Sequence, residues 1–199
     1  MDHPYCYPGT DVYRNKEDIR DRYELESFER QHSGDRLLTL PHNLPITVQG
    51  YCEINRYILQ DVYDWAGEYR TVTTGRGAPF CKAEFIAPEM NKRFAAITAE
   101  DNLRGLTADQ FAARAAEHTC ELNAIHPFLD GNGRTQRAFL EVLAEQAGHE
   151  IDLARIDPLG WNQAAKESYY RQDYRPMRNI IADAIVEREH KNQAGPDQE

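Results

Sequence analysis

The sequence predicts a mostly helical domain that carries one short β-hairpin. Apolar residues recur at spacings of three and four along most of the chain, and capping residues or prolines precede the resulting stripes. Only one stretch, 69–86, is rich in β-branched and turn-forming residues. A chain of 199 residues is long enough for one domain with a substantial core. We therefore expect a single domain over 1–190, with roughly seven to eight helices, and a disordered polar tail at 191–199.

Composition and charge exclude several classes of function. The formal net charge of -10 argues against a general nucleic-acid binder, which would present a basic face. No run approaches the ~20 apolar residues that span a bilayer, and the amino terminus lacks the pattern of a signal peptide. We therefore expect a cytoplasmic protein with no direct nucleic-acid partner and no membrane contact. The four cysteines are scattered and are expected to be free thiols, although their even number leaves disulfides open.

The amino-terminal region is expected to be an extended arm followed by a helix. Residues 1–15 contain two prolines, Gly9 and three tyrosines, so we expect an irregular arm that packs through its aromatic rings. Asn15 is the predicted N-cap of the first helix, with Asp18 in its first turn. Its core-facing residues would be Ile19, Tyr23 and Phe28. Ser33 and Gly34 would end this helix.

The second helix and the hairpin are predicted next. One stripe with helical spacing ends at Gly67, and it consists of Val48, Tyr51, Asn55, Ile58, Val62 and Trp65. In 69–86 a β-branched run precedes the turn residues 75–79, which predicts a hairpin and the only strands of the chain. An ordinary surface loop explains the same pattern about equally well. An isolated hairpin is marginal in water, so it must pack against the helices or be ordered by a partner.

The remaining pattern is helical. Pro88 is expected to be the first residue of a helix that buries Met90, Phe94 and Ile97. Thr107 caps the next helix, which should stop near His126 because a residue that precedes proline is displaced from the α region. Its buried stripe would be Phe111, Ala115, His118, Leu122 and Ile125. Three more helices are expected at 134–147, from Asp157-Pro158, and from Pro176.

The stretch 126–137 reads H-P-F-L-D-G-N-G-R-T-Q-R and contains the chemistry of the chain. Glycines flank Asn132 directly before a helix, which leaves backbone N–H groups open to an anion at the positive end of the helix dipole. Arg134 and Arg137 are three residues apart, so they share a face and can both reach phosphate oxygens. This combination indicates a site for more than one phosphate.

Asp130 and His126 add a metal ligand and a base. A carboxylate among phosphates implies a cation, and Mg²⁺ is usually held by one carboxylate together with phosphate oxygens and water. An imidazole with an ordinary pKa near ~6.5 is suited to taking a proton from a hydroxyl. Taken singly, each residue also has an ordinary structural explanation as a cap, a turn or a solvated charge. Their combination within twelve residues favours a functional site.

These residues resemble the signature of the Fic domain family, H-P-F-x-[D/E]-G-N-G-R-x-x-R, at every specified position. The segments 61–67 and 121–123 are also similar to the family's usual text. The segments 7–10 and 168–170 resemble bacterial members of the toxin type. The resemblance therefore covers most of the chain and implies a Fic fold, whose hairpin serves as a target-binding element.

The resemblance implies transfer of AMP from ATP to a Ser, Thr or Tyr hydroxyl of another protein, with release of pyrophosphate. His126 would be the base, Phe128 would anchor the loop in the core, and Asp130 would hold Mg²⁺. The anion hole would consist of Gly131, Asn132 and Gly133, and the outer phosphates would be bound by Arg134 and Arg137. The kinase-like branch that resembles Doc has a lysine in place of Gly133, so glycine points to nucleotidyl transfer.

The resemblance also implies how substrates are recognised. The edge of the hairpin would bind an extended segment of the target protein by strand addition. Phe80 is the candidate clamping residue of the hairpin. Asn162 and Tyr169 are candidates for the pocket of the nucleotide base.

Many Fic proteins are inhibited by a glutamate in the pattern [S/T]-x-x-x-E-[G/N], and no glutamate of this chain is followed by Gly or Asn. The resemblance then implies a toxin inhibited by a separate small antitoxin, whose glutamate pairs with Arg137. Such toxins modify DNA gyrase and topoisomerase IV. Two alternatives stay open: a Fic-fold transferase of UMP, phosphate or phosphocholine, and a non-catalytic nucleotide-binding module. The intact His126 and Asp130 speak against the second.

Overall fold

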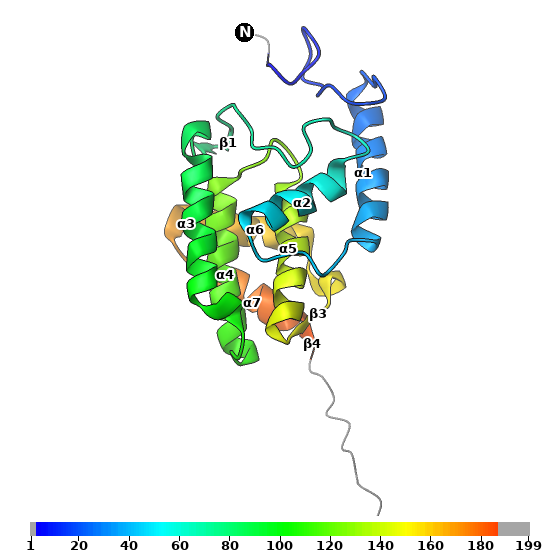
Figure 1. Cartoon of the computed structure of the whole chain (residues 1–199). Helices are drawn as coiled ribbons and strands as arrows, with labels where there is room; N and C mark the ends of the chain where they lie inside the picture. The colour runs from blue at the N-terminus through cyan, green and yellow to red at the C-terminus, as the bar shows by residue number, and fades with distance from the viewer. Residues whose placement is uncertain (1–2, 187–199) are drawn as a thin grey trace, which may run out of the picture.

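The computed structural model describes residues 3–186, except for the side chain of residue 76, and its regular structure is mainly helical (Figure 1). The α-helices of this part of the chain are α1 (Arg22–Leu38), α2 (Val48–Leu59), α3 (Ile86–Ala99), α4 (Ala108–Ile125), α5 (Asn132–Ala147), α6 (Pro158–Arg171) and α7 (Arg175–Ala184). Short 3₁₀ turns lie at Ala83–Phe85, Asp101–Leu103 and Leu153–Arg155. The predicted fold class is confirmed, while the proposed tail at 191–199 lies outside the described residues.

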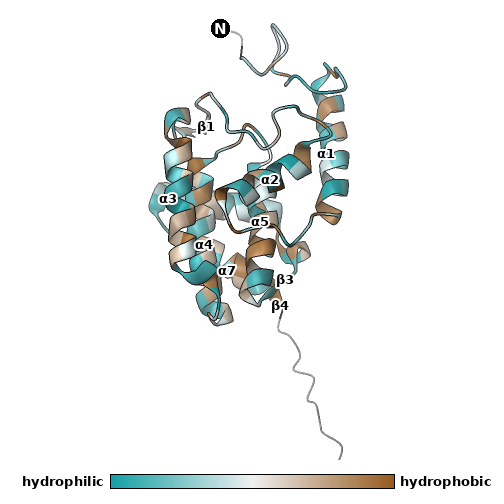
Figure 2. Cartoon of the chain, viewed as in Figure 1, coloured by the Kyte–Doolittle hydropathy of each residue, from teal (hydrophilic) through white to brown (hydrophobic). Residues whose placement is uncertain are grey.

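The helix α4 lies at the centre of the packing. It contacts α3, α5, α6 and α7, and Figure 1 shows α3 running alongside it. Its predicted stripe is buried throughout, and so are the predicted core residues of α3. In Figure 2 the apolar residues, coloured brown, lie mainly on the inward faces of the helices. Full burial of one large apolar side chain contributes roughly 1.5 to 3 kcal/mol, so these stripes dominate the stability of the domain.

Several predicted helix ends are confirmed. Thr107 accepts a hydrogen bond from the Gln110 backbone, and the Gln110 side chain accepts one from the Thr107 backbone in return, which completes a capping box. Asp157 caps α6 and Pro158 is its first residue. Gly148 ends α5 in the left-handed conformation, with φ 92°.

The predicted start and end of the first helix were wrong. The helix begins at Arg22, because the Asp21 side chain, and not Asn15, accepts a hydrogen bond from a first-turn N–H. Asn15 instead closes a local turn by accepting from the Ile19 N–H at 2.9 Å. Tyr23 is 79% exposed and is not a core residue. The helix also continues through Ser33 and Gly34. A Cβ at Gly34 would have no neighbouring atom within 4 Å, so no close contact requires glycine there.

Other boundaries differ as well. The second helix ends at Leu59, so the buried Val62 and the half-buried Trp65 lie in a non-helical segment that follows it. The helix α3 begins at Ile86, two residues before Pro88. The helices α5 and α7 likewise begin slightly earlier than their predicted first residues. Boundary shifts of this size are expected, because the apolar periodicity does not fix the terminal turn.

The hairpin is confirmed but is shorter than 69–86. Strand β1 (Gly75–Arg76) pairs antiparallel with β2 (Ala78–Pro79) around Gly77, whose φ is 84°. The expectation that these are the only strands was wrong, because β3 (Glu150–Ile151) pairs with β4 (Ile185–Val186). Strands of two residues are too short to show the alternation by which a strand is predicted.

The amino-terminal arm packs through its tyrosines, as predicted. Tyr5 and Tyr13 contact Trp65 edge-on at ring-centroid distances of 6.3 and 5.8 Å, and Tyr7 is buried. All four cysteines are free thiols in the described part of the chain. Within residues 3–186 no helix is both long and apolar enough to cross a bilayer.

Candidate active site

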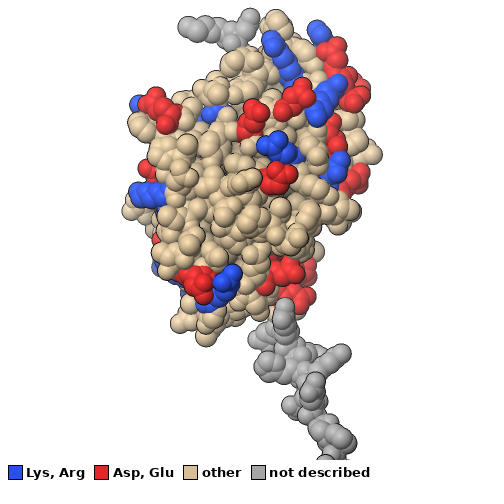
Figure 3. All heavy atoms as spheres, in the orientation of Figure 1, with Lys and Arg blue, Asp and Glu red and all other residues tan. Residues whose placement is uncertain are grey.

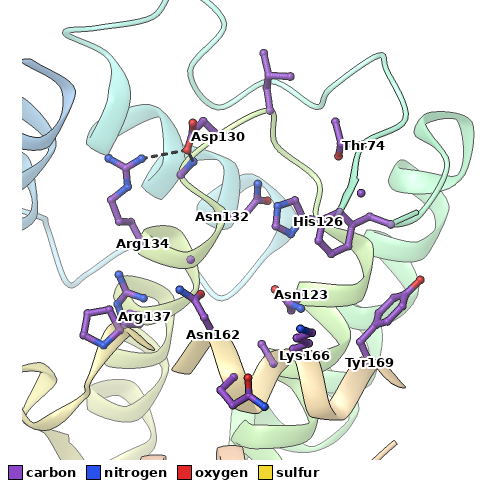
Figure 4. A pocket seen from close by; sticks show the side chains of 18 of the residues that line it. Thr74, Asn123, His126, Asp130, Asn132, Arg134, Arg137, Asn162, Lys166 and Tyr169 are labelled. Carbon is purple, nitrogen blue, oxygen red and sulfur yellow. Dashed lines mark hydrogen bonds and ion pairs between the residues drawn. The ribbon is translucent and has the colours of Figure 1, made fainter. Parts of the chain in front are cut away.

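The loop between α4 and α5 begins at His126, where α4 ends as predicted. His126 is the C-cap of α4 in the left-handed conformation, with φ 50° and ψ 61°. A non-glycine residue there costs roughly 1 to 2 kcal/mol. The Arg70 side chain stabilises this turn by donating to the carbonyls of His126 at 2.8 Å and Ile125 at 3.1 Å. The imidazole is therefore held in a fixed place at the edge of the pocket (Figure 4).

Arg70 also connects the loop to the hairpin. Its side chain is 2% exposed and donates to the carbonyls of Val72 and Cys81, which lie on either side of the hairpin. Burial lowers the pKa of Arg70, and the carbonyl dipoles replace the water that this cation has lost. The hairpin and the loop 126–137 are thus joined by one buried side chain, whose role the sequence pattern did not reveal.

The interior of the loop is closed by Phe128 and Asn132. Phe128 is fully buried and stacks on Tyr51 at 5.6 Å, in the core as predicted. The Asn132 side chain accepts from the Phe128 N–H at 3.1 Å and donates to the Phe128 carbonyl at 2.8 Å. The oxygen and the nitrogen of this amide group both hydrogen-bond within the loop. The Asn132 side chain therefore closes the loop, and the backbone N–H of Asn132 at the start of α5 is a donor for an anion.

Glycine occupies the two positions of the loop for different physical reasons. Gly131 has φ 75°, and a Cβ there would lie 2.8 Å from Leu59 Cδ1 and 2.9 Å from Asn55 Nδ2. At Gly133 a Cβ would approach only an Arg137 nitrogen, at 3.6 Å. The fold therefore requires glycine at the first position but not at the second. Glycine at the second position keeps space open in front of the helix end, where a ligand can approach the backbone.

Asn55 is a functional residue that the sequence analysis treated only as part of an apolar stripe. It is fully buried and donates to the Asp130 carbonyl at 3.1 Å and to Thr135 Oγ1 at 3.0 Å. Its oxygen accepts from the Gly67 N–H at 2.9 Å. A fully satisfied amide in the core fixes the loop against α2. The signal was a polar residue on an otherwise apolar helix face.

Arg134 is surrounded by acceptors. It donates to Glu29 and Asp130, the latter at 3.2 Å, and to Ser33 Oγ at 2.8 Å. Burial by itself would lower the pKa of Arg134, but the charges of Glu29 and Asp130 raise it above its ordinary value. The predicted phosphate ligand is therefore neutralised by the protein itself. Glu29, on α1, is a third residue whose role the sequence analysis missed, after Arg70 and Asn55.

Arg137 has a different environment. Among residues 3–186 Arg137 makes no ion pair. Burial lowers the pKa of Arg137, and the positive charge of Arg134 lowers it further. A half-buried cation without a carboxylate partner attracts an anion strongly. Arg137 lies on α5 and lines the same pocket as the loop (Figure 4), and its role in phosphate binding stays a prediction.

Asp130 can supply one ligand to a divalent cation. Its side chain is 41% exposed, and in the described part of the chain its hydrogen bonds engage Oδ1 only. Residues 3–186 contain no cluster of three or more acidic, His or Cys side chains that could hold a metal alone. A single oxygen donor that faces a phosphate site suits Mg²⁺, which shares its coordination with phosphates and water. The residues therefore fit the expected cation.

A cavity of about 640 Å³ joins these groups to the hairpin and to α6. Its lining includes the predicted Phe80, Asn162 and Tyr169, and the Phe80 ring stacks on the His126 ring at 3.8 Å and 1°. Tyr169 donates to the Pro79 carbonyl at 2.6 Å, which ties α6 to the hairpin. Figure 4 shows Asn162 and Lys166 projecting from α6 into the pocket, while Tyr169 points toward the hairpin side.

The lining of the cavity is basic, in contrast to the chain as a whole. Among the described residues its permanently charged side chains are Arg134, Arg137, Lys166 and Asp130, and because Arg134 pairs with Asp130, the excess positive charge comes from Arg137 and Lys166. On the face in Figure 3 acidic and basic residues are mixed, many of them over α1. The concentration of positive charge in one cavity of an acidic protein indicates a small polyanionic ligand. Lys166 carried no signal in the sequence.

Comparison with known proteins agrees with this chemistry. The model of the Fic/DOC family matches residues 45–144. A Sinorhizobium fredii protein named "Probable protein adenylyltransferase y4lH" is 39% identical over 171 residues, which cover 85% of this chain and 89% of that protein. The Escherichia coli "Probable protein adenylyltransferase Fic" is 38% identical over 188 residues, 92% of each chain. The structure of the Bartonella tribocorum effector BepC with bound AMPPNP has a TM-score of 0.86 and 25% identity, covering 93% of this chain and 97% of that chain.

Proposed function

This chain belongs to the Fic/DOC family, and from that premise we propose that it is a protein adenylyltransferase that moves AMP from ATP to a Ser, Thr or Tyr hydroxyl of another protein. The observation that carries the proposal is the cavity in which His126 faces a cation-rich phosphate site. The names of the relatives and the AMPPNP held by BepC support an adenine nucleotide as the donor.

The transfer requires a base, an anion site and a leaving group. His126 takes the proton of the target hydroxyl, whose oxygen then forms a bond to the α-phosphorus of ATP. The bond from that phosphorus to the bridging oxygen breaks, and pyrophosphate leaves with the electron pair. A positioned general base typically contributes about 10² to 10⁴-fold to the rate. The left-handed turn at His126 and the contact with Phe80 fix the ring for this step.

The phosphates are bound by groups of the loop and of α5. The N–H groups at the start of α5 and the Arg137 guanidinium stabilise negative charge on the phosphates and on the departing pyrophosphate. Asp130 would hold Mg²⁺, which would neutralise the phosphates when bound. Asn162 and Tyr169 line the far part of the cavity, where the base of the nucleotide would lie.

The target protein is proposed to bind along the hairpin. Strands β1 and β2 have only two residues each and leave backbone groups for an added strand. Phe80 follows β2 and lies against His126, so a segment clamped there would present its hydroxyl to the base. Arg70 keeps this hairpin in register with the loop.

We further propose that the protein is a cytoplasmic toxin controlled by a separate small antitoxin. The antitoxin would place a glutamate against Arg137, which lacks a carboxylate partner in the described part of the chain. An ion pair there would exclude a phosphate from the same guanidinium. DNA gyrase and topoisomerase IV are the proposed targets.

The test uses ATP labelled at either the α- or the γ-phosphate, with Mg²⁺ and a bacterial lysate. The α-label should appear on a protein band with the wild-type chain and be lost with His126→Ala. The control variant His42→Ala removes an imidazole that pairs with Glu145 outside the cavity and should retain the label. Transfer of the γ-label alone would establish phosphoryl transfer instead, and no transfer from any nucleotide would indicate a binding module.

A further inference from the structure

Glu29 places a carboxylate at the edge of the proposed phosphate site from an element outside the loop 126–137. It lies on α1, 105 residues from Arg134 in sequence, and its side chain is 14% exposed. One of its oxygens accepts from Arg134, and the other accepts from the Tyr63 hydroxyl. A nearly buried carboxylate with two specific donors is a built feature of the site.

Tyr63 fixes the orientation of Glu29. Its side chain is 2% exposed and its ring stacks on Trp65 at 4.2 Å. Burial, together with the charge of Glu29, raises the pKa of Tyr63, so the phenol stays protonated and keeps donating its hydrogen bond. Glu29 therefore cannot rotate away from Arg134 without breaking a buried contact.

The guanidinium of Arg134 is divided between two carboxylates. One terminal nitrogen donates both to Glu29 and to Asp130 Oδ1, and the other donates to Ser33 Oγ. Arginine and a carboxylate tend to close into a bidentate pair when nothing else holds the guanidinium. Asp130 is four residues before Arg134 in sequence, within easy reach for such a pair. Closure would engage Oδ2 of Asp130, the oxygen that the described contacts leave available.

We propose that Glu29 is a positioning residue that holds Arg134 toward α1 and so keeps Oδ2 of Asp130 available to a divalent cation. The inference rests on the proposed function, in which Asp130 holds Mg²⁺ beside the phosphates. Glu29 touches neither the nucleotide nor the reacting atoms, and it acts entirely through Arg134. Its loss should therefore weaken cation binding before it affects the chemical step.

The test measures Mn²⁺ binding directly, with a non-hydrolysable ATP analogue present, from the electron paramagnetic resonance signal of free Mn²⁺. Glu29→Gln keeps the shape and one of the two acceptor oxygens but removes the charge. We expect about tenfold weaker Mn²⁺ binding, the effect of a coupling near 1.4 kcal/mol between neighbouring residues. Glu26→Gln is the matched control, because Glu26 lies on the same helix and, among residues 3–186, pairs only with Arg22. It should bind Mn²⁺ like the wild type.

Two further variants separate positioning from general damage. In an Arg134→Gln background the additional change Glu29→Gln should have no effect on Mn²⁺ binding, because the residue through which Glu29 acts is gone. Tyr63→Phe retains both charges and should weaken binding only about threefold. Urea unfolding of each variant shows that the chain is folded under the conditions of the titration.

The inference is overturned if Glu29→Gln binds Mn²⁺ as tightly as the wild type or more tightly, or if its effect persists without Arg134. Tighter binding would mean that Glu29 competes with the ligands of the site. The outcome is independent of the proposed reaction, because no transfer is measured. A wild-type chain that binds Mn²⁺ through this network but transfers no AMP would reject only the proposed function.

Discussion

Arg134 and Arg137 lie one turn apart on α5 and have the same predicted role, but their surroundings differ. Arg134 contacts Glu29, Asp130 and Ser33. Arg137 has no ion pair among the described residues, and burial lowers its pKa. The comparison indicates that two arginines of one motif can have different roles. Arg134 is a neutralised part of the framework, and we propose that Arg137 is an anion receptor.

The largest expected effect comes from removing the receptor. Arg137→Ala should weaken the binding of a non-hydrolysable ATP analogue about 100-fold, because two charge-assisted hydrogen bonds to phosphate are lost. The free energy of unfolding should stay the same or rise slightly, since a half-buried charge without a partner is removed. Titration calorimetry and urea unfolding measure the two quantities. Arg104→Ala, which removes an arginine exposed beside Asp101, is the control and should change neither.

Removing the framework arginine should give the reverse pattern. Arg134→Ala leaves Glu29 nearly buried without its cation, which should lower the free energy of unfolding by about 2 kcal/mol. Binding of the ATP analogue should weaken only about tenfold, because the other arginine still faces the phosphates. The division of work is refuted if Arg134→Ala costs more nucleotide affinity than Arg137→Ala.

The two loop glycines test the same distinction between a structural role and a ligand-binding role, with smaller expected effects. Gly131→Ala should destabilise the chain by about 1 to 2 kcal/mol, because of its positive φ and the contact with Leu59. Gly133→Ala should leave the free energy of unfolding nearly unchanged, since a Cβ meets only Arg137. It should instead weaken nucleotide binding by narrowing the approach to the helix end. Equal losses of stability in both variants would contradict the assignment.

The contiguous part of the site could be predicted because its residues are neighbours in sequence. The loop 126–137 holds an imidazole, a carboxylate, glycines and arginines within twelve residues, so their proximity follows without knowledge of the fold. Glu29, Arg70 and Lys166 could not be assigned in this way. The partners of Glu29 and Arg70 lie as far as 105 and 56 residues away in the chain, and no local pattern marks a side-chain contact across that separation. Lys166 reaches the cavity only because α6 packs beside the loop.

The fold shows the same limit. The stripe of α4 predicted a buried helix because a long helix repeats its apolar spacing many times. The start of α1 was wrong because Asn15 and Asp21 are both good caps, and only the packed arm decides between them. The pairing of β3 with β4 joins chain segments after α5 and α7, and strands of two residues leave no periodic trace.

The most direct test of AMP transfer is the mass of the modified target, measured together with the released phosphates. A target protein labelled by the wild-type chain should carry adenosine and one phosphate on a Ser, Thr or Tyr hydroxyl, with one pyrophosphate released per modification. The same reaction with His126→Ala should give neither product. A hydroxyl that carries phosphate alone, with ADP released, would contradict the proposed chemistry.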